Sequence, residues 1–449
     1  MEVQVEESWE ELRESFRNRR TRSAAWRKSQ LRGLLRLLHD KETDIFNAMK
    51  DDLGKHPTET YRDEVGILVK SLNLTLTCLD KWMASSKVHV PLVAFPTSGE
   101  IVPEPLGVVL IFSSWNFPLG LALDPVIGAI AAGNAVLLKP SELAPACSLF
   151  LAKNIPLYLD RKAVKVVEGG ATTAEQLLNK KWDKIFFTGS ARVGRVIMSA
   201  AANHLTPVTL ELGGKCPAIL DLSSISSSRD RAIDSMKERI KKLYGDKPWE
   251  NNSMSRIVNQ NHFRRLRNLI EDPAVAASIV HGGSMDEENL FIEPTILLDP
   301  PLEAEIMTEE IFGPFLPVIT VKRIQDSVDF ISSRPQPLAI YVFSNDETLR
   351  RQVIAETSSG GVTFNDAIIQ FACDTLPFGG VGQSGFGKYH GKFSFDAFSH
   401  GKSVLRRSLK TEMSFGYPPW TDHKLPFLRA AYNFDYIGIF LLLIGLKRK

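Results

Sequence analysis

Short apolar runs alternate with helical patterns through the middle of the chain. Helices are expected near residues 125–132, 142–154, 172–179 and 191–203, beside strands at Val108–Phe112, Ala135–Leu138, Val164–Val167, Ile185–Phe187 and Val208–Leu212. Strands that are apolar throughout, rather than at every second position, are buried on both faces of a sheet. The pattern therefore predicts an α/β fold with a doubly wound parallel sheet covered by helices.

A second α/β pattern follows this sheet, and a hairpin precedes it. The second pattern has helices near residues 324–333 and 346–357, and strands at Ile311–Val321, Leu338–Phe343 and Gly361–Asn365. The segment Val88–Pro103 is rich in β-forming residues and proline, and Ser98-Gly99 is a turn sequence within it. We expect a second α/β domain and a small projecting β hairpin with its turn at Ser98-Gly99.

The C-terminal segment is unusually apolar. Ile437–Leu446 contains ten residues without a charge, and Lys447, Arg448 and Lys449 follow it. Ten helical residues span about 15 Å, which is half of a bilayer core of about 30 Å. The segment is therefore interpreted as a short interfacial membrane anchor with a basic end. The alternative is a tail that docks on a partner subunit.

Composition limits the classes of protein to consider. A chain of 449 residues corresponds to about two or three domains. Its formal net charge of +2 is too small for a dedicated nucleic-acid binder. The four cysteines form no CxxC pair, so neither a metal site nor a disulfide framework is expected. Sparse cysteine usage and the lack of an apolar signal sequence in residues 1–30 favour a cytoplasmic location.

Two segments at strand ends are candidates for binding a nucleotide. Gly189 and Gly194 flank the start of a helix after a strand, where backbone N–H groups can approach a phosphate. A helix start that merely needs glycine is the alternative. Lys139 and Glu142 follow another strand, where they are placed to hold ribose hydroxyls or to form a solvated pair.

Further polar residues are candidates for catalysis. Glu211 is a lone acid at the end of an apolar strand, where burial would raise its pKa towards the range of a general base. A paired structural carboxylate is the alternative. Asn116 follows the first strand, where its amide could stabilise an oxyanion or cap a turn. The loop that contains Glu310 and Phe312 could wrap a ligand.

Taken together, these strings resemble the aldehyde dehydrogenase superfamily. They are, in order, WNFP, LLKPSE, FFTGS, TLELGGK, EEIFGP, GGVTFND and PFGGVGQSG. The set is most similar to the class 3 (fatty-aldehyde) branch, in particular its plant-type members. The resemblance implies NAD(P)-dependent oxidation of medium- or long-chain aldehydes to carboxylic acids. It also implies a homodimer, or a heterodimer with family subunits, built around the hairpin 88–103 and a strand after about residue 396.

The resemblance implies a role for each matched position. Asn116 would form the oxyanion hole, and Glu211 would be the general base. Lys139 and Glu142 would hold the adenine ribose, Glu310 the nicotinamide ribose, and Phe312 would lie beside the nicotinamide ring. The pyrophosphate would face Gly189, Ser190, Ala191, Arg192, Val193 and Gly194.

The nucleophilic cysteine of the family's GQxC motif is missing from this chain. Family-like sequence runs to about Leu222 and resumes near Ser228, so a helix, the GQxC loop and a strand are predicted to be absent at a Ser-rich join. Loss of the thiolate removes the covalent intermediate, so impaired activity is expected. The alternatives are a non-catalytic cofactor-binding protein that pairs with intact family subunits, or a splice or gene-model variant.

These interpretations give a provisional division of the chain. The dinucleotide-binding domain would comprise residues 1–87 and 104–212, the catalytic domain 213–395 with its truncation near 222–228, the oligomerisation arm 88–103 and 396–420, and the C-terminal tail 421–449. The tail would place the protein on the cytosolic face of a membrane such as the endoplasmic reticulum.

Overall fold

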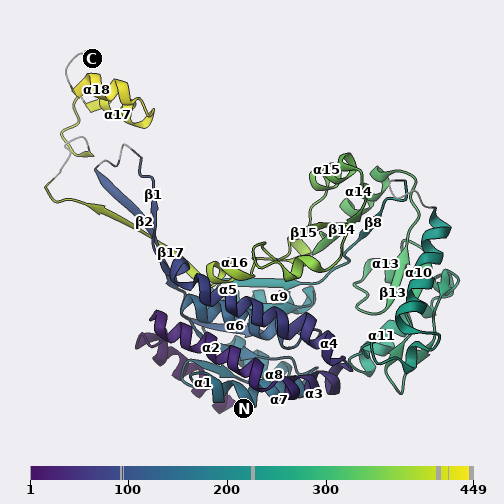
Figure 1. Ribbon diagram of the computed structural model, residues 1–449. Helices are drawn as coiled ribbons and strands as arrows, with labels where there is room; N and C mark the ends of the chain where they lie inside the picture. Colours follow the sequence, from purple (N-terminus) through teal and green to yellow (C-terminus); the bar gives the residue numbers. More distant parts are fainter. Residues whose placement is uncertain are drawn as a thin grey trace. The chain divides into compact units, whose positions relative to one another are not determined.

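The computed structural model describes residues 2–91, 94, 96–223, 228–410, 416–422 and 424–443 (Figure 1). The chain divides into two compact units. The first comprises residues 1–79 and 105–398, and the second comprises residues 80–104 and 399–449.

A six-stranded sheet forms the centre of the first unit. Its order is β16-β7-β6-β3-β4-β5, and all neighbouring strands are parallel except β16 and β7. The strands are β3 (Val108–Phe112), β4 (Ala135–Lys139), β5 (Val164–Val166), β6 (Lys184–Gly189), β7 (Val208–Leu212) and β16 (Gly385–Phe386). Every residue of β3 and β4 is buried, as expected for parallel strands covered on both faces.

Helices cover both faces of this sheet, which confirms the predicted doubly wound α/β fold (Figure 1). On one face, α1 (Glu2–Arg17), α8 (Ala171–Leu178) and α9 (Ala191–Ala202) share an apolar core with the strands. On the other face lie α6 (Gly120–Ala132) and α7 (Pro145–Tyr158). Helix α6 is buried along its whole length. The remaining N-terminal helices are α2 (Ala24–Asp40), α3 (Glu42–Leu53), α4 (Pro57–Thr60), the π-helical turn η1 (Tyr61–Val65) and α5 (Gly66–Met83).

The predicted second α/β region contains two small sheets rather than one. The first has the order β15-β14-β8 and the second the order β13-β12-β9. Their strands are β8 (Ala218–Leu220), β14 (Ala339–Phe343), β15 (Gly361–Phe364), β9 (Ile279–His281), β12 (Thr295–Leu298) and β13 (Phe315–Val318). Each sheet has its own apolar core. The strand expected over Ile311–Val321 is shorter because Phe312 has a φ of +50°, which is incompatible with a strand.

Helices and short elements complete this region. The longer helices are α10 (Arg229–Tyr244), α11 (Gln260–Glu271), α14 (Ile324–Ser332) and α15 (Glu347–Glu356). The short elements are α12 (Pro273–Ala276), β10 (Met285–Asp286), β11 (Phe291–Ile292), α13 (Glu305–Thr308), α16 (Gly391–Ala397) and the 3-10 turns Pro248–Glu250, Ile369–Ala372 and Gly382–Ser384. The Ser-rich join lies largely outside the described residues, since 224–227 are not among them.

The second unit contains a three-stranded sheet of order β1-β2-β17. Its strands are β1 (Ser86–Val88), β2 (Thr97–Pro105) and β17 (Ser399–Arg407). The predicted turn at Ser98-Gly99 is wrong, because Gly99 pairs with Val88 inside the antiparallel ladder. A Cβ atom on Gly99 would lie 2.9 Å from Val88 Cγ2, so glycine is needed there for close strand contact rather than for a turn.

Two short helices follow β17 in the second unit. They are α17 (Lys424–Tyr432) and α18 (Tyr436–Leu443), which bury Ala430, Ala431 and Ile439 between them. The apolar segment predicted at Ile437–Leu446 is therefore helical to Leu443, and residues 444–449 lie outside the described part of the chain. No helix in the described residues combines the length and apolar character needed to cross a bilayer.

Candidate functional site

Glu211 lies at the carboxyl end of β7 with its side chain almost completely buried. It stands between Thr188 of β6 and Gly385 of β16, and only 7% of its surface is exposed. Burial raises the pKa of its carboxyl to about 8, the charge of Glu310 adds to the shift, and the Thr188 hydroxyl opposes it. Glu211 therefore exchanges protons near neutral pH, as a general base must.

Glu310 supplies a second carboxylate beside the Gly213-Gly214 turn that follows β7. A Cβ atom on Gly213 would collide with the Glu310 carboxylate, so only glycine lets the two segments approach this closely. Burial raises the pKa of Glu310, whereas the Gly214 N–H, Arg265 and Lys215 oppose the shift. The two acids predicted for catalysis and for the cofactor thus lie in one neighbourhood.

Lys215 fastens the turn after β7 to the loop that carries Glu310. Its ammonium donates hydrogen bonds to the carbonyls of Ile306 at 2.7 Å and Glu309 at 3.1 Å. Burial lowers the pKa of Lys215 to about 8, the charge of Arg334 lowers it further, and Glu310 opposes the shift. The backbone carbonyls that hold Lys215 therefore fix the relative position of two loops that the sequence places far apart.

Asn116 lies in the loop between β3 and α6, and a buried ion pair holds this loop. Lys55 Nζ donates to the Asn116 carbonyl at 2.9 Å and to Glu64 Oε1 at 3.0 Å. Glu64 Oε2 in turn accepts the N–H groups of Leu119 at 2.8 Å and Gly120 at 3.0 Å, at the start of α6. Burial raises the pKa of Glu64, and the charge of Lys55 opposes this shift.

Trp115, next to Asn116, joins this loop to the second α/β region. Its ring lies edge-on between Phe312, with centroids 5.0 Å apart, and His262, with centroids 5.1 Å apart. Burial lowers the pKa of His262, and the charge of Arg265 adds to this effect. His262 is therefore neutral at physiological pH, and the contact is a packing of aromatic rings.

Lys139 and Glu142 are brought together at the carboxyl end of β4. Lys139 Nζ lies 2.8 Å from Glu142 Oε2, with the lysine buried and the carboxylate half exposed. β4 is the neighbour of β3 in the sheet, so this pair and Asn116 follow adjacent strand ends. The pair presents one donor group and one acceptor group at the edge where ligands bind in open α/β sheets.

The helix start after β6 uses its glycines mainly for packing. A Cβ atom on Gly194 would lie 2.9 Å from Leu212 Cδ2, and one on Gly189 would lie 2.6 Å from Phe187 Cζ. The Ser190 hydroxyl accepts the Val193 N–H at 3.3 Å and caps α9. The first turn of α9, with Ala191 and Arg192, follows directly and carries the positive end of the helix dipole.

The cysteines are poorly placed for nucleophilic chemistry. Cys216 precedes β8 and is exposed. Protein packed around its thiol raises its pKa, and the charges of Glu310 and Glu211 add to the shift, so the thiol stays protonated at neutral pH. Burial raises the pKa of Cys147 far above its usual range. Cys78 and Cys373 are only partly exposed.

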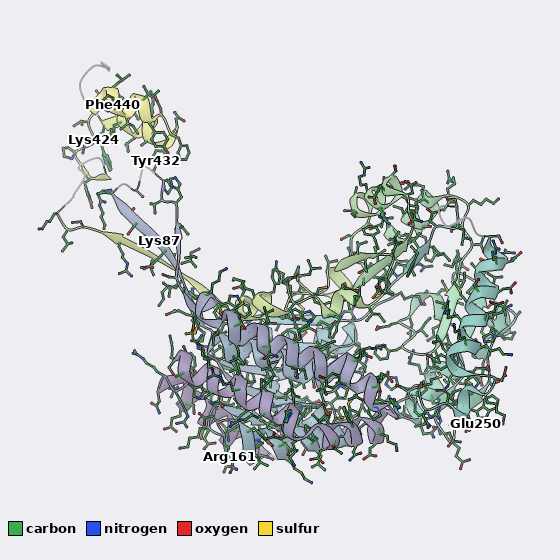
Figure 2. All side chains as sticks on the ribbon, viewed as in Figure 1. Lys87, Arg161, Glu250, Lys424, Tyr432 and Phe440 are labelled. Carbon is green, nitrogen blue, oxygen red and sulfur yellow. The ribbon has the colours of Figure 1, made fainter. Side chains whose placement is uncertain are left out.

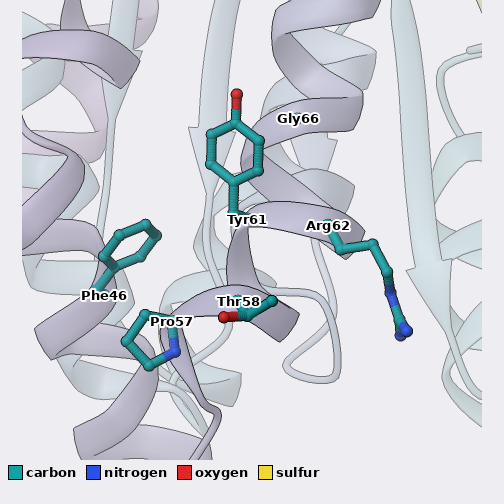
Figure 3. A pocket seen from close by; sticks show the side chains of 6 residues that line it. All are labelled: Phe46, Pro57, Thr58, Tyr61, Arg62 and Gly66. Atoms are coloured by element: carbon teal, nitrogen blue, oxygen red, sulfur yellow. The ribbon is translucent and has the colours of Figure 1, made fainter.

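A surface hollow of about 610 Å³ lies elsewhere in the first unit (Figure 3). It is lined by Phe46, Pro57, Thr58, Tyr61, Arg62 and Gly66. Figure 3 shows the Arg62 side chain pointing away from the others, and Asp63 accepts its hydrogen bonds at 2.6 and 2.7 Å. None of the predicted site residues lines this hollow, so it is not part of the candidate site.

Several residues that shape the site escape sequence reasoning. Lys55 and Glu64 lie nine positions apart around a helix boundary, and no local motif marks them as a pair. His262 and Arg265 belong to α11, whose alternating basic and apolar residues are typical of an ordinary surface helix. Lys55 precedes the N-cap residue His56 of α4, and Glu64 follows Arg62 and Asp63 in a charged helical turn, so neither position stands out in the sequence.

Replacement of Lys55 by methionine should destabilise the fold. Lys55→Met leaves the buried Glu64 carboxylate without its counter-ion, which costs about 3–5 kcal/mol of unfolding free energy. Urea denaturation measures this loss, and the double variant Lys55→Met/Glu64→Gln should recover part of it. Lys41→Met, which removes an exposed pair with Asp44, should barely move the midpoint. Equal effects of Lys55→Met and Lys41→Met would contradict the assignment.

The raised pKa of Glu211 should make stability depend on pH. The folded state holds this proton up to about pH 8, whereas the unfolded chain releases it near 4.5, so stability should fall as pH rises between these values. Glu211→Gln should remove this loss, and each unit of pKa shift corresponds to about 1.4 kcal/mol. Unfolding free energies at several pH values test this, with exposed Glu288→Gln as the control. A Glu211→Gln curve parallel to wild type would refute the shift.

Comparison with known proteins places the chain in a family. The sequence profile of the aldehyde dehydrogenase family matches residues 1–224 and 225–404. Aldehyde dehydrogenase family 3 member F1 of Arabidopsis thaliana is 52% identical over 481 aligned positions, which cover 100% of this chain and 99% of the relative. Family 3 member A2 of Rattus norvegicus is 38% identical, with 98% of this chain and 97% of the relative covered.

A solved structure and the alignment length add two observations. AldH of Staphylococcus aureus, solved in a substrate-bound state, superimposes with a TM-score of 0.91 at 36% identity and covers 95% of this chain and 99% of its own. The alignment with the Arabidopsis protein exceeds the chain by 32 positions (481 − 449), which have no counterpart here. The chain belongs to the aldehyde dehydrogenase family and is, by family, an oxidoreductase.

Proposed function

We propose that this chain is an aldehyde dehydrogenase whose cofactor and base residues are retained but whose covalent step is impaired. Two observations support the proposal: the family profile matches in two pieces that meet between residues 224 and 225, and the alignment with the Arabidopsis relative exceeds the chain by 32 positions. In the relatives that the motifs resemble, the nucleophilic cysteine follows the ELGGK glutamate by a few tens of residues. The absent stretch has the length and position to include it.

NAD(P) is the proposed cofactor, and the residues present suit it. Lys139 and Glu142 offer an ammonium and a carboxylate to ribose hydroxyls, and the start of α9 at Ser190 offers N–H groups to a pyrophosphate. The oxidised cofactor would supply an acceptor for the hydride of the aldehyde carbon. The Glu142 carboxylate would repel a 2′-phosphate, which favours NAD over NADP.

The chain's own residues would still perform part of the chemistry. The Asn116 amide would donate to the oxygen of a medium- or long-chain aldehyde, and Glu211 would take a proton from water. Cys216 is a poor substitute for the missing nucleophile, because its raised pKa leaves little thiolate at neutral pH. Without a nucleophile, a covalent mechanism loses on the order of 10⁶ in turnover.

The second unit is the proposed contact with another subunit. Its sheet β1-β2-β17 carries exposed apolar side chains at Val88, Ile101 and Leu405, as expected of a surface that a partner covers. The partner would be a second copy of this chain or an intact family subunit. The alternative, a splice or gene-model variant without settled function, is favoured by the same interruption and would be decided by sequencing the transcript across the codons for residues 215–235.

Cofactor binding should survive while turnover is lost. NAD⁺ should quench the tryptophan fluorescence of the purified chain. Lys139→Met should weaken NAD⁺ binding about tenfold or more, because it removes a charged hydrogen bond. The exposed Lys153→Met is the matched control.

With a medium-chain aldehyde, absorbance of NADH should rise no faster than in the Cys216→Ser variant. Turnover at the rate of the intact Arabidopsis relative would disprove the impairment.

The helices of the second unit are the proposed peripheral membrane contact, through residues 437–449. Tyr432 on α17 and Phe440 on α18 are exposed (Figure 2). Ile437 on α18 is also exposed, with 74% of its surface in contact with solvent. Aromatic and aliphatic side chains with basic residues nearby are typical of helices that lie in a membrane interface. We propose a cytoplasmic protein that contacts the cytosolic face of a membrane such as the endoplasmic reticulum.

Sedimentation with lipid vesicles tests the membrane contact. The full chain should bind vesicles of phosphatidylcholine and phosphatidylserine at about 3:1, because anionic lipid attracts the basic end. Ile437→Asp/Phe440→Asp should reduce binding at least about tenfold, since each apolar side chain loses its burial in lipid. Leu409→Asp, at a fully exposed leucine outside the two helices, should bind like wild type. Unchanged binding by the double variant would exclude this contact.

A further inference from the structure

The edge strand β8 presents unpaired backbone groups. It is the last strand of the sheet β15-β14-β8. In a parallel ladder, successive residues direct their N–H and C=O groups to alternate sides. Pro217 and Asp221 bond to β14, and so does Ile219 in the same register, so Ala218 and Leu220 point their N–H and C=O groups to the free side. Within the described backbone, these groups have no partner.

The strand β13 is the corresponding edge of the second sheet. Carbonyls of Pro314 and Val318 accept the N–H groups of Thr295 and Asp299, each at 2.8 Å, so these residues face β12. By the same alternation, the carbonyls of Phe315 and Pro317 face the free side. A proline is tolerated at such a position because its missing N–H breaks no bond to β12. Each sheet therefore ends in an edge strand with free backbone groups, which are N–H and C=O groups on β8 and C=O groups on β13.

The segments that precede the two edge strands contact each other. Lys215, which precedes β8, donates to the carbonyls of Ile306 and Glu309, which precede β13. The Glu310 carboxylate also lies against Gly213 at the same point. The segment before β8 and the segment before β13 are thus joined by contacts other than strand pairing.

Their carboxyl ends are also linked, through the start of α10. The chain leaves β8 at Leu220 and enters α10 at Arg229. Arg229 Nη1 lies 3.9 Å from Oδ2 of Asp299, the residue that follows β12. Asp299 donates its N–H to Val318, the last residue of β13. The eight residues 221–228 therefore connect the carboxyl end of β8 to the carboxyl ends of the second sheet.

The missing positions match one complete helix-strand unit. Two parallel strands need a crossover of a dozen or more residues, and a βαβ unit takes about 30 or more. The alignment with the Arabidopsis relative exceeds the chain by 32 positions, and the family profile matches in two pieces that meet between residues 224 and 225. The proposed interruption assigns the missing positions to this join. A crossover helix and a following parallel strand would bring the chain back to the carboxyl edge, where α10 starts. Removal of that unit therefore leaves both flanking ends at the same edge.

We infer that β8 and β13 flank a slot for one parallel strand, and that this slot binds the corresponding segment of a family relative supplied in trans. The inference rests on the proposed function, because it places the segment proposed to be missing between β8 and β13. A strand in the interior of a parallel sheet is apolar on both faces. The slot matches this chemistry, since Leu220 and Leu316 expose apolar side chains on the two flanking strands. The occupant would join the two sheets into one.

Amide hydrogen exchange of the full chain tests the slot without any substitution. The probe is a synthetic peptide. Its sequence is the segment of the Arabidopsis relative that has no counterpart in this chain at the proposed interruption between residues 224 and 225. At saturation it should slow exchange of the Ala218 and Leu220 amides at least tenfold. The Ile219 amide, already bonded to β14, should change little. The amides of Val362 and Phe364, which face the outer side of β15 by the same alternation, are matched controls and should not change.

The outcomes separate this inference from the proposed function. A chain that binds NAD⁺ but shows no protection of Ala218 and Leu220 has no such slot. Equal protection by a peptide of scrambled sequence, or protection that depends only on the concentration of the chain itself, would also overturn the inference. Rapid aldehyde oxidation without any peptide would instead overturn the proposed impairment. Selective protection at the two slot-facing amides supports the inference, whether or not turnover returns.

Discussion

The parallel direction of the strands is the constraint on which the rest of this structure depends. Parallel neighbours can be joined only by crossovers that return to the starting edge, so the carboxyl ends of β3, β4, β6 and β7 lie at one edge of the sheet. Lys139 is the last residue of β4, and Asn116, Ser190 and Gly213 follow the ends of β3, β6 and β7. The site is therefore assembled by topology, from residues about 100 positions apart, before any side chain makes a specific contact.

Specific contacts then fix the loops that topology gathers. The buried pair of Lys55 and Glu64 holds the loop after β3 and caps α6, so two charges are stabilised by each other and by backbone groups. Lys215 and the ring of Trp115 attach the loop of Glu310 and Phe312 from the other side. None of these contacts involves residues at the join between residues 224 and 225. The environment of the acid pair therefore does not depend on the segment that is proposed to be absent there.

Sequence patterns predicted the buried strands closely and the tertiary contacts poorly. Val108–Phe112 and Val208–Leu212 have the predicted bounds, because a fully apolar run between turns leaves few alternatives for a chain that must bury it. The turn at Ser98-Gly99 was wrong because glycine served close strand packing instead. The pair of Lys55 and Glu64 and the division of the second region into two sheets depend on partners distant in sequence, which local patterns do not encode.

The pKa of the Glu211 carboxyl is set by groups other than a cysteine. Its pKa is raised by its own burial in β7 and by Glu310, with Thr188 opposing, and no cysteine contributes to this balance. Burial likewise raises the pKa of the Cys216 thiol, and the charges of Glu310 and Glu211 add to this shift. The surroundings that favour the protonated form of Glu211 therefore also favour the protonated form of this thiol.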